Sequence, residues 1–275
     1  MTECLAMVIL NIITIIVFVK QRQLQRRSTY LIIHLAVVDL LTGVVSGPLQ
    51  IERIGSNDHL REYNRPDISY LLILERIFGY LFPVISFLIL AFISVERVHA
   101  TFCPFRHRFI TRRFYRLITA VIWLVPLAVR TAQALMIHFF SLSSNNFNTS
   151  IIYLSYFVVL FVVICVCYVL IYLKVRFSRY PQHHGAADLR ERKLTSTLFL
   201  VTLGSLLTIL PTIIFISLLV FHFEFLRSFS RKSSFNFLLV MDLLFFTNSL
   251  INPIIYAVRM PKVRASLIQL LFCKS

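Results

Sequence analysis

Seven long apolar segments dominate the sequence and leave few folds open to it. A helix of roughly 20 apolar residues crosses the ~30 Å hydrocarbon layer of a bilayer. Inside that layer the backbone has to satisfy its own hydrogen bonds, which a helix does within one segment. The short alternating segments typical of membrane barrels are not seen. The sequence therefore predicts an all-α membrane protein, a bundle of seven transmembrane helices at residues 3–19, 29–51, 69–99, 114–139, 150–176, 191–222 and 236–258.

The charge distribution supports this prediction and suggests an orientation. Hydrophobic residues make up 58% of the chain and charged residues only 15%. In a soluble protein the net charge of +16 would suggest a nucleic-acid partner, but here the basic residues lie mainly between the apolar segments, so no nucleic-acid binding is expected. Lysine and arginine are most frequent after the first, third and fifth segments and in the tail. The positive-inside rule then places the N-terminus outside and the C-terminus in the cytoplasm of a multi-pass plasma-membrane protein.

The ends and loops carry anchoring and modification signals within what we expect to be a single membrane domain over residues 1–275. Residues 261–272 form a basic amphipathic stretch, which predicts a short eighth helix on the inner leaflet. Cys273 beside it is a palmitoylation candidate, with a plain free thiol as the alternative. Asn148 begins an Asn-Thr-Ser glycosylation acceptor in a predicted outer loop.

The first segment is short, because only ten residues precede Asn11. We expect that amino-terminal residues are missing from this sequence. A signal peptide over residues 1–20 is the alternative, and it is disfavoured because the basic residues follow the apolar stretch rather than precede it.

Polar residues within the apolar segments are the strongest functional signal, because ionisable groups in a bilayer are costly. Asp39 lies in the middle of the second segment and Arg97 at the inner end of the third. In the seventh, Asn248, Asn252 and Tyr256 recur every fourth residue and so share one face of a helix. Pro253 removes a backbone donor from that helix.

These residues carry a resemblance to a known family. Over its whole length the sequence resembles the rhodopsin-like (class A) G-protein-coupled receptors. The resemblance rests on motifs that occur in order, each in the expected segment: Asn11, Leu35-Ala36-x-x-Asp39, Glu96-Arg97-Val98, Pro104, Trp123, Tyr168, Pro211 and Asn252-Pro253-x-x-Tyr256. The third segment lacks the usual cysteine, where Leu72 stands, and the fifth lacks its proline, where Leu160 stands. Melanocortin receptors share both departures, which points to the adenosine, melanocortin and lipid branch.

The resemblance implies a switch at the cytoplasmic ends of the helices. In the family, the arginine matched by Arg97 is held by a carboxylate on the sixth helix, and Glu191 lies 20 residues before Pro211, at that position. Glu96 is a second carboxylate beside the guanidinium. The resemblance further implies that the sixth helix swings outward about Pro211, with Tyr168 and Tyr256 turning inward. The alternative is that Arg97 and Glu191 only follow the charge bias of the inner side.

The resemblance also implies a sodium site in the middle of the membrane. Asp39 supplies the charge, and hydroxyl and amide groups come from Ser86, Asn248, Ser249 and Asn252. Such oxygen ligands suit hard cations. The alternative is a protonated Asp39 in a water-mediated polar network. No cofactor other than this sodium ion is expected.

The ligand is the least constrained part of the prediction. The polar positions in the outer half of the bundle are Glu75, Arg76, Gly79, Arg130, Gln133 and Asp242, of which Gly79 occupies the family's amine-binding position. Biogenic amines are therefore disfavoured, and a zwitterionic or peptide ligand is the expectation. The alternative is that Glu75 and Arg76 only extend to the membrane interface.

The predicted function is that of a non-enzymatic receptor, which binds an extracellular ligand and activates heterotrimeric G proteins, with arrestin as a further partner. A transporter is disfavoured because the sequence shows no evident inverted repeat. The usual tryptophan before Pro211 is missing, since the local residues are Thr208, Ile209 and Leu210. A non-signalling seven-helix protein, acting as a decoy or as a partner subunit, therefore remains the main alternative.

Overall fold

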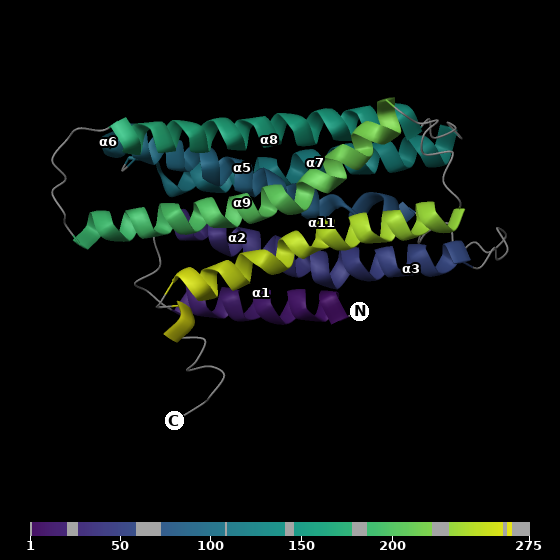
Figure 1. Ribbon diagram of the computed structural model, residues 1–275, viewed down its shortest axis with the longest axis horizontal. Coiled ribbons are helices and arrows are strands. Elements are labelled where there is room, and N and C mark those ends of the chain that lie inside the picture. Colours follow the sequence, from purple (N-terminus) through teal and green to yellow (C-terminus); the bar gives the residue numbers. More distant parts are fainter. Residues whose placement is uncertain are drawn as a thin grey trace, which may run out of the picture.

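The computed structural model is a bundle of long helices that run side by side (Figure 1). It describes residues 2–20, 27–58, 73–107, 109–140, 146–177, 186–221, 231–260 and 263–265, and no strand occurs among them. A helical stretch at residues 73–78 precedes α5. The other elements are α1 (Thr2–Lys20), α2 (Arg27–Leu41), η2 (Thr42–Ser46), α3 (Gly47–Asp58), α5 (Leu81–Phe102), α6 (Pro104–His107), α7 (Arg112–Phe140), α8 (Asn146–Phe177), α9 (Ala186–Phe221) and α11 (Arg231–Arg259).

The described part of the chain contains seven helices that are long and apolar enough to cross a membrane. The second of these spans is continuous from α2 through η2 into α3. The predicted fold class, an all-α bundle of seven transmembrane helices, is therefore confirmed. Several helices extend beyond the predicted apolar segments, as α8 and α9 do, because helical hydrogen bonding continues into the polar turns at their ends. Of the predicted eighth helix, only the helical residues 263–265 are described.

The third span is the axis of the bundle. Within Ile73–Phe102 most residues of the apolar window are buried, 72%, against 17% for the span in α7. α5 packs against α2, α7, α8, α9 and α11, so its side chains face protein on nearly every side. A residue on α5 is therefore placed to touch several other spans at once, whereas most of α7 faces its surroundings. Figure 1 also shows α9 changing direction along its length, and Pro211 lies inside this helix. Proline removes one helical hydrogen bond and commonly kinks a helix.

The second span contains a five-residue π-helical segment that was not predicted from the sequence. In η2 the Gly47 N–H donates to the Thr42 carbonyl, five residues back instead of four. Gly43 and Gly47 at this segment allow α1 to come very close. A β-carbon on Gly43 would lie 3.0 Å from the Cys4 carbonyl oxygen, and one on Gly47 would lie 2.4 Å from the Cys4 sulfur. Small residues at such positions are typical of tightly packed membrane helices.

The close contact between Gly47 and Cys4 predicts that the effect of Gly47→Ala on stability changes sign when Cys4 is replaced. Gly47→Ala is expected to destabilise the protein, because overpacking of about 1–3 kcal/mol exceeds the helix-propensity gain of about 1 kcal/mol. In a Cys4→Ala background the sulfur is gone and the nearest atom is the Cys4 β-carbon at 3.5 Å. In this Cys4→Ala background, Gly47→Ala is expected to stabilise the protein. Thermal unfolding of the four purified variants in detergent measures both effects, and an equal sign in both backgrounds would contradict the close contact.

Candidate functional site

A carboxylate at the centre of the bundle joins three spans. Asp39 on α2 is fully buried. Its Oδ1 accepts hydrogen bonds from the hydroxyls of Ser86 on α5 and Ser249 on α11, each at 2.9 Å. Its Oδ2 accepts from the Asn252 side-chain amide at 2.7 Å. A buried charge is tolerated only where such partners compensate it, so these three donors explain how Asp39 can lie there.

Further buried oxygen atoms belong to the side chains of this region. Asn11 on α1 donates to the Ser249 carbonyl at 3.2 Å and to the Met7 carbonyl at 2.9 Å. The side-chain oxygens of Asn11, Asn248 and Asn252 are buried and have no hydrogen-bond partner among the described residues. An all-oxygen set of one carboxylate, hydroxyls and amides suits a hard cation such as sodium. The described residues contain no group of three His, Cys, Asp or Glu side chains that would suit a metal of another kind.

Glu96 forms a second buried centre, which ties α5 to α6 and α7. Arg97 donates to Glu96 Oε2 through Nε at 2.7 Å and also through Nη2. On the other carboxylate oxygen, His107 Nε2 lies at 2.9 Å and the Tyr115 hydroxyl donates at 3.0 Å. The side chains of both Glu96 and Arg97 are almost fully buried. The arginine is thus held by its own neighbour on α5 and does not face lipid.

The other predicted switch residues fall in several places. Glu191 lies within α9, but its side chain lies outside the described side chains, so the predicted contact with Arg97 stays a prediction. Val98 is partly buried and packs on the core. The predictions for Asn148, Cys273 and most of residues 261–272 also fall outside the described side chains or residues.

Three contacts hold the N-terminal half of α9 against α8 and α11. The Tyr168 hydroxyl on α8 lies 2.8 Å from the Thr202 hydroxyl and donates to the Leu198 carbonyl at 3.3 Å. At the end of α11, Arg259 donates to the Ser196 hydroxyl at 2.9 Å.

The motif residues of α11 are buried beside the first span. Tyr256 is buried and packs edge-on against Phe18 of α1, with ring centroids 5.7 Å apart. Its hydroxyl has no hydrogen-bond partner among the described residues. Pro253 is also buried in α11.

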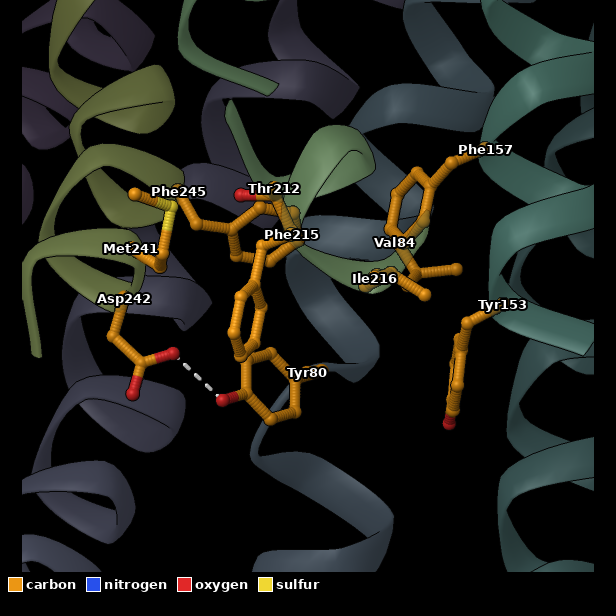
Figure 2. A pocket seen from close by; sticks show the side chains of 10 residues that line it. All are labelled: Tyr80, Val84, Tyr153, Phe157, Thr212, Phe215, Ile216, Met241, Asp242 and Phe245. Carbon is orange, nitrogen blue, oxygen red and sulfur yellow. Dashed lines mark hydrogen bonds between the residues drawn. The ribbon is translucent and has the colours of Figure 1, made fainter. Parts of the chain in front are cut away.

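A cavity of about 190 Å³ lies between α5, α8, α9 and α11 (Figure 2). The Tyr80 hydroxyl donates to Asp242 Oδ1 at 2.7 Å across it, which joins α11 to the residue just before α5. Asp242 is the one predicted pocket residue that lines this cavity. The lining residues are Tyr80, Val84, Tyr153, Phe157, Thr212, Phe215, Ile216, Met241, Asp242 and Phe245.

The other predicted pocket residues lie outside the cavity lining. Arg130 donates to the Ile77 carbonyl at 3.4 Å and lies over the Tyr153 ring, 5.4 Å from its centroid. Gln133 accepts from the Tyr153 hydroxyl at 3.4 Å, and Glu75 accepts from the side-chain amide of Gln50 at 3.4 Å. Arg130 and Gln133 thus contact the cavity-lining Tyr153 without lining the cavity themselves, and Glu75 contacts Gln50.

Gly79 and Arg76 are also absent from the lining. A β-carbon on Gly79 would lie 2.6 Å from the Gln50 amide nitrogen and from the Glu75 carbonyl oxygen. Gly79 is thus a position of close packing. Arg76 is partly exposed.

Most of the lining was not predicted from the sequence, because these residues are apolar or aromatic rather than charged or amide-bearing. The missed residues lie three or four apart on each helix, as in Tyr80 and Val84, Tyr153 and Phe157, or Thr212 and Ile216. Residues at this spacing share one helix face. The signal in the sequence is a helix face that combines aromatic rings with a hydroxyl group.

These features define the chain as a multi-pass membrane protein with a receptor-like helix bundle, a central buried acid and a cavity between its helices. The family profile described as the seven-transmembrane receptor (rhodopsin family) matches residues 10–256, most of the chain. The chain belongs to this family. No curated protein matches the chain.

Proposed function

We propose that this protein is a plasma-membrane receptor that binds an extracellular ligand in the cavity and activates a heterotrimeric G protein. The N-terminus lies outside and the C-terminus in the cytoplasm. The observation that carries the proposal is the course of α9. This helix lines the cavity with Thr212, Phe215 and Ile216, and its inner half makes the contacts with Tyr168 and Arg259. Pro211 lies between the two parts.

The proposed signal is a movement of the inner half of α9. A ligand that touches Thr212 acts one residue from Pro211, where the helix lacks a backbone hydrogen bond. Outward movement has to break the contacts of Thr202 with Tyr168 and of Ser196 with Arg259. Each such hydrogen bond contributes about 0.5–1.5 kcal/mol. Their sum is comparable with a typical coupling free energy of about 1–3 kcal/mol, so ligand binding can supply it. The groove that opens admits a helix of the G protein.

The Asp39 cluster is proposed to hold a sodium ion that favours the closed bundle. Asp39 would supply the charge, and Ser86, Ser249, Asn248 and Asn252 the neutral oxygens. The buried amide oxygens of Asn248 and Asn252, which have no protein partner among the described residues, support this proposal. A bound cation contributes a fixed positive charge that compensates the carboxylate and links α2, α5 and α11. Arrestin is proposed as a further partner at the same inner surface.

Loss of the arginine at the inner end of α5 is expected to abolish coupling. In cells that express the receptor with each class of Gα, wild type is expected to raise guanine-nucleotide exchange above cells without receptor. Arg97→Ala is expected to return exchange to that baseline, because the buried guanidinium is a charged group that the proposed opening of the bundle would expose to the G protein. Cell-surface labelling controls for expression.

The same assay separates the proposal from its main alternative. If neither wild type nor Glu96→Gln, which removes the carboxylate that holds Arg97, shows exchange with any Gα class at normal surface expression, the protein acts as a non-signalling decoy or partner subunit. Exchange that persists in Arg97→Ala would contradict the role given to the arginine.

A further inference from the structure

A histidine at the inner end of the bundle shares the buried carboxylate that holds Arg97. The Nε2 atom of His107 lies 2.9 Å from Glu96 Oε1, and Arg97 binds the other carboxylate oxygen. The side chain of His107 is 18% exposed, whereas that of Glu96 is 3% exposed. Figure 1 shows α6 at the same end of the bundle as the start of α9 and the end of α11. His107 therefore connects the buried carboxylate with the solvent on the side that the G protein approaches.

Building on the proposed function, we propose that His107 is a proton-binding site through which the pH of the cytoplasm regulates the receptor. Histidine is the side chain that ordinarily changes its charge between about pH 5 and 8. Protonation of His107 turns its contact with Glu96 into an ion pair, and a carboxylate at this distance favours the charged form of histidine. The proton and the closed contact therefore stabilise each other.

The backbone around His107 holds its ring against the third span. α6 begins at Pro104, directly after the end of α5. The His107 N–H donates to the Cys103 carbonyl at 2.9 Å, and the His107 carbonyl accepts from the Ile110 N–H at 3.3 Å. The ring also packs against the ring of His99 on α5, with centroids 5.8 Å apart. The gain or loss of a proton thus acts on a contact that is already formed.

The neighbouring histidine is less suited to bind the proton. His99 is partly buried, and its Nδ1 is buried without a hydrogen-bond partner among the described residues. A charged histidine carries a proton on both ring nitrogens. In a charged His99 the Nδ1 atom would be a buried donor without an acceptor, which is costly. His107 has both an acceptor and access to solvent, so the proton is expected there.

The other polar and charged groups around His107 limit the size of the effect. Tyr115 on α7 donates to the same oxygen of Glu96, and Arg97 on α5 neutralises part of the charge of this carboxylate. Further positive charges come from exposed arginines, where solvent and salt screen them. They are Arg106 on α6 and Arg112 and Arg113 on α7. The direct contact with Glu96 therefore determines the sign of the effect.

The sign follows from the state in which the contact exists. At acidic pH the closed receptor has the full benefit of the ion pair between His107 and Glu96. This benefit is lost as the pH rises through the range in which histidine gives up its proton, so the open fraction increases. A partly exposed pair contributes more than a surface pair and less than a buried one, so the ratio of open to closed receptor is expected to change about threefold to tenfold.

The first measurement is ligand-independent nucleotide exchange in receptor membranes with added G protein, from about pH 6 to about pH 8. His107→Gln is the reference, because its amide can donate to Glu96 but does not titrate. Dividing by the exchange of this variant at the same pH removes the pH dependence of the G protein itself. For wild type the quotient is expected to rise about threefold to tenfold with pH. His99→Gln removes the neighbouring ring and is expected to keep the rise.

The second measurement does not depend on signalling. Thermal unfolding of purified full-length wild type and His107→Gln in detergent is followed over the same pH range. The midpoint of wild type is expected to exceed that of the variant by more at the acidic end of the range than at the alkaline end. In a Glu96→Gln background, the difference that His107→Gln makes is expected to be independent of pH.

The two measurements separate the proton site from the proposed function. A midpoint difference that changes with pH, without exchange by wild type or Glu96→Gln on any Gα, would retain the proton site and contradict G-protein activation. The proposal is overturned if the midpoint difference is constant with pH or keeps its pH dependence in Glu96→Gln. It is also overturned if a signalling receptor gives a flat quotient, or if His99→Gln abolishes the rise. In those cases exchange that depends on Arg97 would still support the receptor function.

Discussion

Glu96→Gln is expected to raise ligand-independent nucleotide exchange about tenfold over wild type. The carboxylate accepts hydrogen bonds from Arg97, from Tyr115 and, with the appropriate tautomer, from His107, and so keeps the arginine within its own helix. Breaking a buried ion pair costs about 3–5 kcal/mol, and a shift of only ~1.4 kcal/mol between two states changes their ratio tenfold. The loss destabilises the closed state, in which the contact exists, and releases the guanidinium for a G protein.

Tyr115→Phe is the matched control for this prediction. It removes one donor from Glu96 and leaves the contact with Arg97 in place, so its rise in exchange is expected to be smaller. Both variants are compared at equal surface expression. Wild-type exchange in Glu96→Gln, in a receptor whose Arg97→Ala variant has lost coupling, would show that the contact does not restrain the switch.

The second large effect is expected at Asp39. In Asp39→Ala, the hydroxyls of Ser86 and Ser249 and the amide of Asn252 lose their shared acceptor. Each buried group left without a partner costs about 1–3 kcal/mol, so a loss of about 3 kcal/mol or more in stability is expected. Asp39→Asn keeps one acceptor oxygen and is expected to lose less. Thermal unfolding in detergent gives the order of the three proteins, and equal stability of wild type and Asp39→Ala would refute the structural role of the cluster.

The sodium proposal gives the same position a second readout. Replacing potassium chloride by sodium chloride is expected to raise the thermal midpoint of wild type and to have no effect on Asp39→Asn. Asp242→Asn makes the same chemical change at another membrane carboxylate and is expected to keep the sodium response. A sodium response that survives in Asp39→Asn would exclude this cluster as the ion site.

The sequence predicts the fold well because the bilayer imposes a simple rule. Long apolar segments have to be helices, and their number and order can be read directly. The central cluster around Asp39 could also be predicted from the sequence, although Asp39 and Asn252 are 213 residues apart. A costly charge in an apolar segment requires partners, and the polar face of the seventh helix offers them.

The remaining contacts depend on details that no single pattern encodes. His107 and Tyr115 reach Glu96 only because the chain turns back through α6 into α7, and neither position is unusual in the sequence. Residues that lie beside the cavity could not be distinguished from those that line it, for a similar reason. Polarity alone suggested Arg130 and Gln133, but both reach Tyr153 from outside the lining. Which side of a helix faces a cavity depends on packing angles, and these are set by contacts such as that of Gly204 with Ile251.

The π-helical segment at residues 42–46 has a consequence for the comparison of receptors by position. A single turn with five-residue spacing inserts one extra residue and rotates everything beyond it by about 100°. Gln50 thereby reaches Glu75 on the third span. Positions counted along the chain from Asp39 are therefore offset by one residue beyond Ser46 from those of a relative whose second helix is regular there. Side chains of this span beyond Ser46 are to be matched to those of such a relative by superposition, with a one-residue gap in the alignment.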